Sequence, residues 1–103
     1  MAQFDVVANP RPETRREVPF LVVLQSDLLE PLATCVVAPL REPDTAPPVR
    51  TLMPVFRIDG RGLVMSTPEL AGVLRSELGQ TVGSLADRRG DIVAALDLLF
   101  TGI

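Results

Sequence analysis

The chain contains no histidine, tryptophan or tyrosine, and it has one cysteine. Without histidine it lacks the usual general base near neutral pH, any Ser–His or Cys–His pair, and most zinc-ligand sets. The single cysteine, Cys35, excludes an internal disulfide. These absences count against most hydrolytic enzymes and metal centres, so we expect no metal, no cofactor and no enzymatic activity.

Size and charge set further limits. The 103 residues are enough for one domain, and a core of that size gains stability from dimerisation. All ten basic residues are arginine, and the net charge is −3. This balance argues against bulk attraction to nucleic acid or to an acidic membrane. Because no apolar run approaches about 18 residues, we expect a cytoplasmic protein folded as a single domain over residues 1–103.

Short apolar runs, separated by proline, glycine and charged residues, predict five or six strands followed by one helix. Asp59-Gly60 between two such runs predicts a hairpin. The continuous apolar run 20–24 predicts a strand buried on both faces, and Pro39 is expected to end the strand that begins at Thr34. The predicted strands cover 4–7, 20–24, 34–38, 53–58, 62–66 and 80–82, with one helical turn within 67–78 and a helix over 87–100 capped by Ser84 or Asp87.

The end of the chain is apolar where helices more often give way to polar residues. An apolar group of this kind predicts a surface that meets a second copy or another partner. We expect the interface of a homodimer here, formed by Leu98, Leu99, Phe100 and Ile103.

Few residues offer chemistry. Cys35 lies within a strand-like apolar run, which is typical of a buried, inert thiol. Arg57 and Thr67, or Ser26, could in principle act on a phosphodiester, but their spacing matches no catalytic pattern.

Several stretches, in this order and spacing, resemble the CcdB family, the toxins of bacterial CcdA–CcdB toxin–antitoxin systems. They are Gln3-Phe4, the segment 20–40 with Leu24 to Glu30 and Val36 to Leu40, Pro54 to Ile58, and Asp91 to Ile103. The resemblance implies a mainly β fold with a C-terminal α-helix, an SH3-like small barrel of the CcdB/MazF type. It also implies a homodimer packed around the C-terminal helices.

The family resemblance implies a non-enzymatic toxin that wedges the ends of its paired helices into the A subunit of DNA gyrase. Such a toxin traps the complex of gyrase with cleaved DNA. Where the family has Phe-Trp-Gly-Ile, this chain has Thr101 in place of the tryptophan, which removes a ring that stacks on a gyrase arginine. The gyrase-binding positions carried over are Leu28, Leu29, Glu30, Arg89, Val93, Asp97, Phe100, Thr101, Gly102 and Ile103.

The resemblance further implies a CcdA-like antitoxin whose disordered tail wraps the toxin. We expect the proline-rich loops 8–17 and 41–50 to be mobile and to form the rim of the antitoxin groove, with arginines facing acidic residues of the antitoxin. The expected antitoxin-binding residues are Arg11, Arg15, Arg16, Arg41, Arg50 and Leu63.

Two alternatives remain open. One is a CcdB-like protein that still binds an antitoxin but has lost or changed its gyrase target. The other is a MazF-like endoribonuclease, in which Arg57 and Thr67 would converge on a phosphate. The net negative charge counts against the second alternative.

Overall fold

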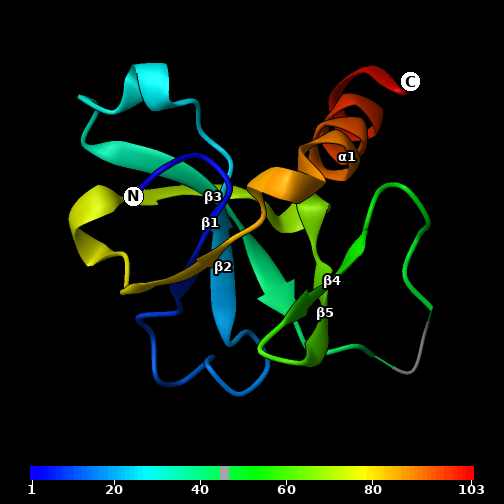
Figure 1. The fold of residues 1–103 in the computed structure, drawn as a ribbon, viewed down its shortest axis with the longest axis horizontal. Helices are drawn as coiled ribbons and strands as arrows, with labels where there is room; N and C mark the ends of the chain where they lie inside the picture. The colour runs from blue at the N-terminus through cyan, green and yellow to red at the C-terminus, as the bar shows by residue number, and fades with distance from the viewer. Residues whose placement is uncertain (45–46) are drawn as a thin grey trace.

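The computed structural model of this chain describes residues 1–44 and 47–103 (Figure 1). Within those residues it contains seven strands and one α-helix, so the predicted mainly β fold with a C-terminal helix is confirmed. One further strand is present beyond the five or six expected. The elements are β1 (Asp5–Ala8), β2 (Phe20–Val23), β3 (Thr34–Arg41), β4 (Val55–Ile58), β5 (Arg61–Met65), β6 (Ala71–Leu74), β7 (Thr81–Ser84) and α1 (Arg89–Thr101).

The strands form a curled, antiparallel sheet in the order β4-β5-β3-β2-β1-β7, with β6 also paired to β3. The long strand β3 pairs with β2 along one side. Its other side is shared, because β6 pairs with Thr34 to Val37 and β5 pairs with Leu40 and Arg41. The sheet therefore divides along β3, and this division bends it into the half-barrel that Figure 1 shows beneath α1.

Pro39 lies at this division, inside β3, so the expectation that it ends the strand was wrong. Its carbonyl accepts a hydrogen bond from the Ser66 backbone N–H at 2.9 Å, on the side where β6 gives way to β5. Proline lacks an N–H, which would break a ladder elsewhere in a sheet. Pro39 lies between the part of β3 that pairs with β6 and the part that pairs with β5. No regular ladder needs a backbone N–H from β3 at this position, so the proline is tolerated.

Apolar residues on the two faces of the sheet build two clusters. Alternate residues of a strand point to opposite faces, so Val22 joins the main cluster and Val23 joins the second. The prediction that this strand is buried on both faces is thereby confirmed. The main cluster lies between the sheet and α1 and includes Phe4, Leu40, Phe56, Leu63, Met65, Ile92 and Ala95.

The β4–β5 hairpin was predicted correctly. Asp59 and Gly60 both have positive φ, at 52° and 77°. Two consecutive residues of this kind make the turn whose twist matches the flanking strands, and the pair Asp-Gly tolerates it well. The turn thus fixes the register that pairs Phe56 with Leu63.

A short 3-10 turn over Thr67–Glu69 agrees with the helical turn expected within residues 67–78, and a second 3-10 turn covers Arg75–Glu77. The strand β6 between them, which pairs with β3, was not predicted. Helix α1 begins at Arg89, after a 3-10 turn over Ala86–Arg88, and no side chain caps it. Ser84 accepts a hydrogen bond from the Ala86 N–H instead, at the start of that preceding turn.

Candidate functional site

The end of α1 projects from the body of the protein (Figure 1). Phe100 is 69% exposed and Ile103 is 92% exposed. Gly102, at φ 77°, ends the helix in the left-handed conformation, and its N–H donates to the Leu98 carbonyl at 3.1 Å. Glycine adopts this conformation without steric cost, so it turns the last residue away from the helix axis. The Thr101 hydroxyl donates to the Asp97 carbonyl at 2.7 Å and is therefore already satisfied.

The predicted gyrase-binding residues of the helix share one side of it. At 100° per residue, they fall within an arc of about 120°. The Arg89 guanidinium lies over the Phe4 ring, with 5.6 Å from its carbon to the ring centroid, which holds that side chain against the sheet. The residues on this side are Arg89, Val93, Asp97, Phe100 and Thr101.

The other predicted gyrase-binding residues lie in the 3-10 turn Asp27–Leu29 and at Glu30, just after it. Leu28 is 89% exposed. The Asp27 carboxylate accepts a hydrogen bond from the Gln3 N–H at 2.7 Å, which ties the turn to the N-terminal segment. In Figure 1 this turn and the end of α1 project from the same edge of the view.

An apolar hollow of about 290 Å³ lies between the end of β2 and the end of α1. Of the predicted dimer residues, Phe100 lines it. Leu98 lies about 160° around the helix from Phe100, and Leu99 is half-buried. The predicted set therefore does not form one continuous seam on a single helix. The hollow is lined by Leu24, Gln25, Val36, Leu70, Leu96 and Phe100.

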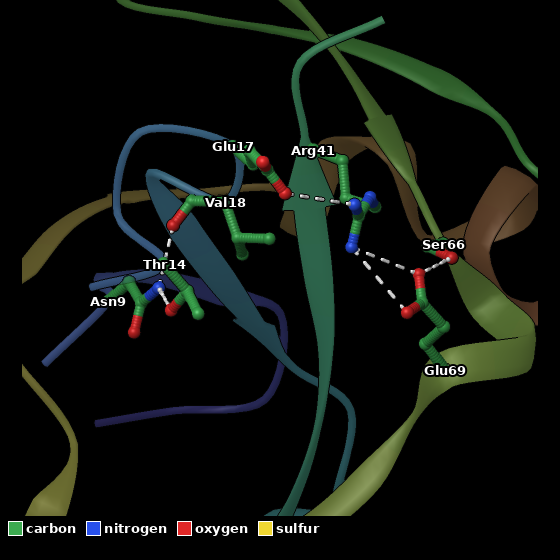
Figure 2. A network of polar contacts seen from close by, with 7 residues as sticks. All are labelled: Asn9, Thr14, Glu17, Val18, Arg41, Ser66 and Glu69. Carbon is green, nitrogen blue, oxygen red and sulfur yellow. Dashed lines mark hydrogen bonds and ion pairs between the residues drawn. The ribbon is translucent and has the colours of Figure 1, made fainter. Parts of the chain in front are cut away.

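Asn9 organises the loop between β1 and β2. Its side-chain amide donates to the Thr14 hydroxyl at 2.9 Å and to the Val18 carbonyl at 2.8 Å, as Figure 2 shows. Its side-chain oxygen accepts from the Arg11 N–H, and its backbone carbonyl accepts from Arg15 Nε, both at 3.0 Å. The sequence analysis did not single out Asn9, although an Asn-Pro pair that opens a loop is a known turn signal.

Arg41, at the end of β3, lies between two carboxylates (Figure 2). Its guanidinium is 3.7 Å from Glu17 and 3.3 Å from Glu69. Glu69 also accepts a hydrogen bond from the Ser66 hydroxyl at 2.6 Å. The Arg41 charge is thus balanced within the chain.

Arg41 lines three hollows, and two of them have apolar walls. The first, of about 250 Å³, has an apolar floor that includes Leu21, Val37, Val73 and Leu78, with Arg11 among its rim residues. The second, of about 200 Å³, is lined by Pro47, Pro48, Val49, Met53 and Val64 among others. The arginine forms a common wall, so the structure brings Arg41 and Arg11 together at one groove. Arg16 is exposed on the same loop as Arg11.

The remaining predicted antitoxin residues lie elsewhere. Arg50 lines a separate hollow beside the start of α1. Leu63 is fully buried in the main cluster, so its place among the antitoxin-binding residues was wrong: a side chain inside the core has no surface to offer. Residues 45–46 of the predicted loop 41–50 lie outside the described residues.

The candidate phosphodiester pair is not assembled for catalysis. Thr67 is fully buried, and its hydroxyl donates to the Leu52 carbonyl at 2.6 Å. Arg57 is exposed on the hairpin and donates to the Gly60 carbonyl at 2.8 Å.

Burial raises the pKa of the Cys35 thiol, although the Arg75 charge opposes this.

The described part of the chain holds no group of three or more metal-ligating side chains. No helix within residues 1–44 and 47–103 has the length and apolar character needed to span a membrane.

These features define a small β protein whose candidate surfaces are a projecting helix end and an arginine-containing groove between loops. The family model of the CcdB protein matches residues 3–102, nearly the whole chain. The chain therefore belongs to the CcdB family, as the resemblance indicated, and its family is one of toxins of toxin–antitoxin systems. No curated protein matches it significantly.

Proposed function

We propose that this toxin poisons DNA gyrase through the end of α1, acts in the cytoplasm without enzymatic chemistry, and is neutralised by a CcdA-like antitoxin. The observation that carries the proposal is the projecting, apolar helix end, with Phe100 exposed in its last turn and Ile103 exposed beyond the left-handed Gly102. Exposed apolar side chains that gather in one place are typical of surfaces that bind a partner.

A homodimer supplies two such ends. The hollow beside Phe100 offers an apolar surface for a second copy, and a symmetric dimer repeats each contact. Two helix ends wedged into the paired A subunits of gyrase would hold the enzyme on its cleaved DNA. Family membership supports this mechanism, which uses shape and contact rather than a reacting group.

The test combines growth arrest on induced expression with a gyrase DNA-cleavage assay on purified protein. We expect arrest and trapped cleavage complexes, both abolished by Ile103→Glu. The matched control is Val82→Glu, which also places a carboxylate at an exposed aliphatic position, on β7. If Ile103→Glu poisons gyrase as well as the unaltered chain does, the helix end is not the gyrase-binding surface.

Thr101 allows a second, gain-of-function test. A threonine has no ring to stack on an arginine, and a cation–π contact contributes roughly 0.5–2 kcal/mol at each site. We expect Thr101→Trp to lower the concentration needed for half-maximal cleavage by about 2- to 30-fold per site, taking 1.4 kcal/mol as tenfold. Thr101→Val, which loses only the hydroxyl bond to Asp97, serves as the control.

The presence of threonine at position 101, where the family has tryptophan, also favours a second candidate function. With its hydroxyl bonded back to the helix and no aromatic group, this position offers gyrase little, so the protein would bind its antitoxin without poisoning gyrase. That function predicts tight antitoxin binding, no growth arrest and no trapped cleavage complexes. Arrest without cleavage would instead indicate another target.

A further inference from the structure

A hollow of about 330 Å³ separates the loop before β4 from the first turns of α1. Two guanidinium groups line it, from Arg50 on the loop side and Arg88 on the helix side, against one carboxylate, Asp91. This is a local excess of positive charge on a protein whose net charge is −3. The other lining residues are Thr51, Pro54 and Ala94.

Arg88 is held in place before any ligand arrives. Its Nε lies 2.7 Å from the Asp91 carboxylate. Its guanidinium carbon lies 4.8 Å from the centroid of the buried Phe56 ring. A guanidinium has five N–H donors, and the contact with Asp91 uses the Nε edge. The terminal nitrogens keep donors for a second carboxylate, and the stacked ring fixes the plane of those donors.

Arg50 is in the opposite situation. It is exposed, and within the part of the chain that the structure describes its guanidinium has no ion-pair partner. The next residue, Thr51, has φ 68°, a left-handed conformation that β-branched residues rarely adopt. The tight turn, closed by the Met53 N–H to Val49 carbonyl bond at 2.8 Å, maintains that conformation.

Two of the arginines expected to bind the antitoxin beside the loop groove, Arg41 and Arg15, already have partners within the chain. Glu17 and Glu69 balance Arg41, and Arg15 donates to the Asn9 carbonyl. An acidic residue of a partner would have to displace an internal carboxylate to reach Arg41. At the Arg50–Arg88 hollow it would meet Arg50, which has no ion-pair partner among the described residues, and Arg88, which has donors to spare.

We propose that a carboxylate side chain of the antitoxin binds between Arg50 and Arg88, which makes this hollow the acid-recognition site of the toxin. The inference rests on the proposed antitoxin binding and assigns a place to it. Guanidinium groups bind carboxylates through paired, charge-assisted hydrogen bonds. Arg88, which the sequence analysis did not select, is thus an antitoxin-binding residue, and Arg41 is not.

Calorimetric titration of this chain with its cognate CcdA-like antitoxin tests the inference. We expect Arg50→Glu to weaken binding by about 10- to 100-fold, equivalent to about 1.4–2.8 kcal/mol. Arg41→Glu, the same change at an arginine balanced within the chain, should weaken it less than about threefold. Arg50→Lys keeps the charge but loses the paired geometry, so its loss should be intermediate. Circular dichroism establishes that each variant is folded.

The outcomes separate the inference from the function beneath it. If the unaltered toxin fails to bind the antitoxin, the proposed neutralisation itself is wrong. If the unaltered toxin binds and Arg50→Glu binds equally well, or Arg41→Glu weakens binding as much, the acid-recognition site is not here. Parallel titrations with inorganic phosphate and a single-stranded oligonucleotide complete the design. Saturable binding of either that Arg50→Glu abolishes, with antitoxin affinity unchanged, would assign the hollow to phosphate groups instead.

Discussion

At the scale of single residues, the arginines differ more in their surroundings than in their exposure. Arg41 lies between two carboxylates, Arg88 and Arg89 lie over phenylalanine rings, and Arg50 lies in an open hollow. Surface ion pairs contribute little to stability, about 0–1 kcal/mol each. The main effect of these ion pairs is therefore that they leave some guanidinium groups available to a partner and others not.

Cys35 gives a residue-scale prediction about pH. Burial raises the pKa of its thiol above the ordinary value of 9.0, with the Arg75 charge acting in the opposite direction. The unfolded thiol ionises first as pH rises, so the free energy of unfolding should hold steady below about pH 8 and fall above pH 9. The chain has no tyrosine or lysine, so no other side chain titrates between roughly pH 8 and 12.

Urea denaturation from pH 7 to 10.5 measures this dependence. Cys35→Ala, which leaves a cavity but no ionisable group, should be less stable at every pH and lack the decline above pH 9. A decline of equal size in that variant would show that the thiol is not its cause.

At the scale of elements, the sequence predicted correctly the elements that depend on neighbouring residues alone. The Asp59-Gly60 hairpin and the final helix depend on turn residues and on apolar spacing, and both were confirmed. The segment 70–78 has apolar residues at helical spacing, yet β6 forms there because β3 offers it a pairing partner. A pairing between segments distant in sequence leaves no local signature, and Pro39 within β3 was misjudged for the same reason.

The candidate sites also differ in whether neighbouring residues or long-range contacts form them, and only the former could be predicted. The exposed end of α1 could be predicted because the chain itself shows an apolar end after a helix. Leu63 could not be placed, because alternation along a hairpin strand does not say which face meets the core. The neighbourhood of Arg50 and Arg88 joins two segments far apart in sequence, so only the folded chain reveals it.

A contact between elements supports a stability prediction at Gly79. A Cβ atom added there would lie 2.3 Å from the Ala8 carbonyl oxygen, too close for any real contact. The obstacle is backbone of β1 and cannot rotate away, so we expect Gly79→Ala to lower the free energy of unfolding by about 2 kcal/mol or more. Gly72→Ala, where a Cβ meets nothing within 4 Å, should change it by less than about 0.5 kcal/mol. Urea denaturation at pH 7 compares the two, and equal stabilities would contradict the close approach.

At the scale of the whole molecule, the apolar hollow beside Phe100 predicts the oligomeric state. We expect the protein to sediment as a dimer at micromolar concentration and Phe100→Glu to sediment as a monomer, since a carboxylate would be buried without a partner. Leu28→Glu makes the same change at a residue that is 89% exposed and outside the hollow, so it should remain a dimer. A monomeric parent chain, or a dimer that survives Phe100→Glu, would contradict the prediction.

The pairing of β1 with β7 has a kinetic consequence. The strand β1 pairs on its outer side with β7, which lies more than 70 residues later in the sequence, as the pair Val7 and Thr81 shows. Ile92 and Ala95, which belong to the main cluster, come later still in the sequence. Contacts that close such long loops slow folding. A nascent chain on the ribosome cannot close its sheet or cover its core until these segments have emerged. The fold that this chain shares with its toxin family therefore forms only after nearly the whole chain has been synthesised.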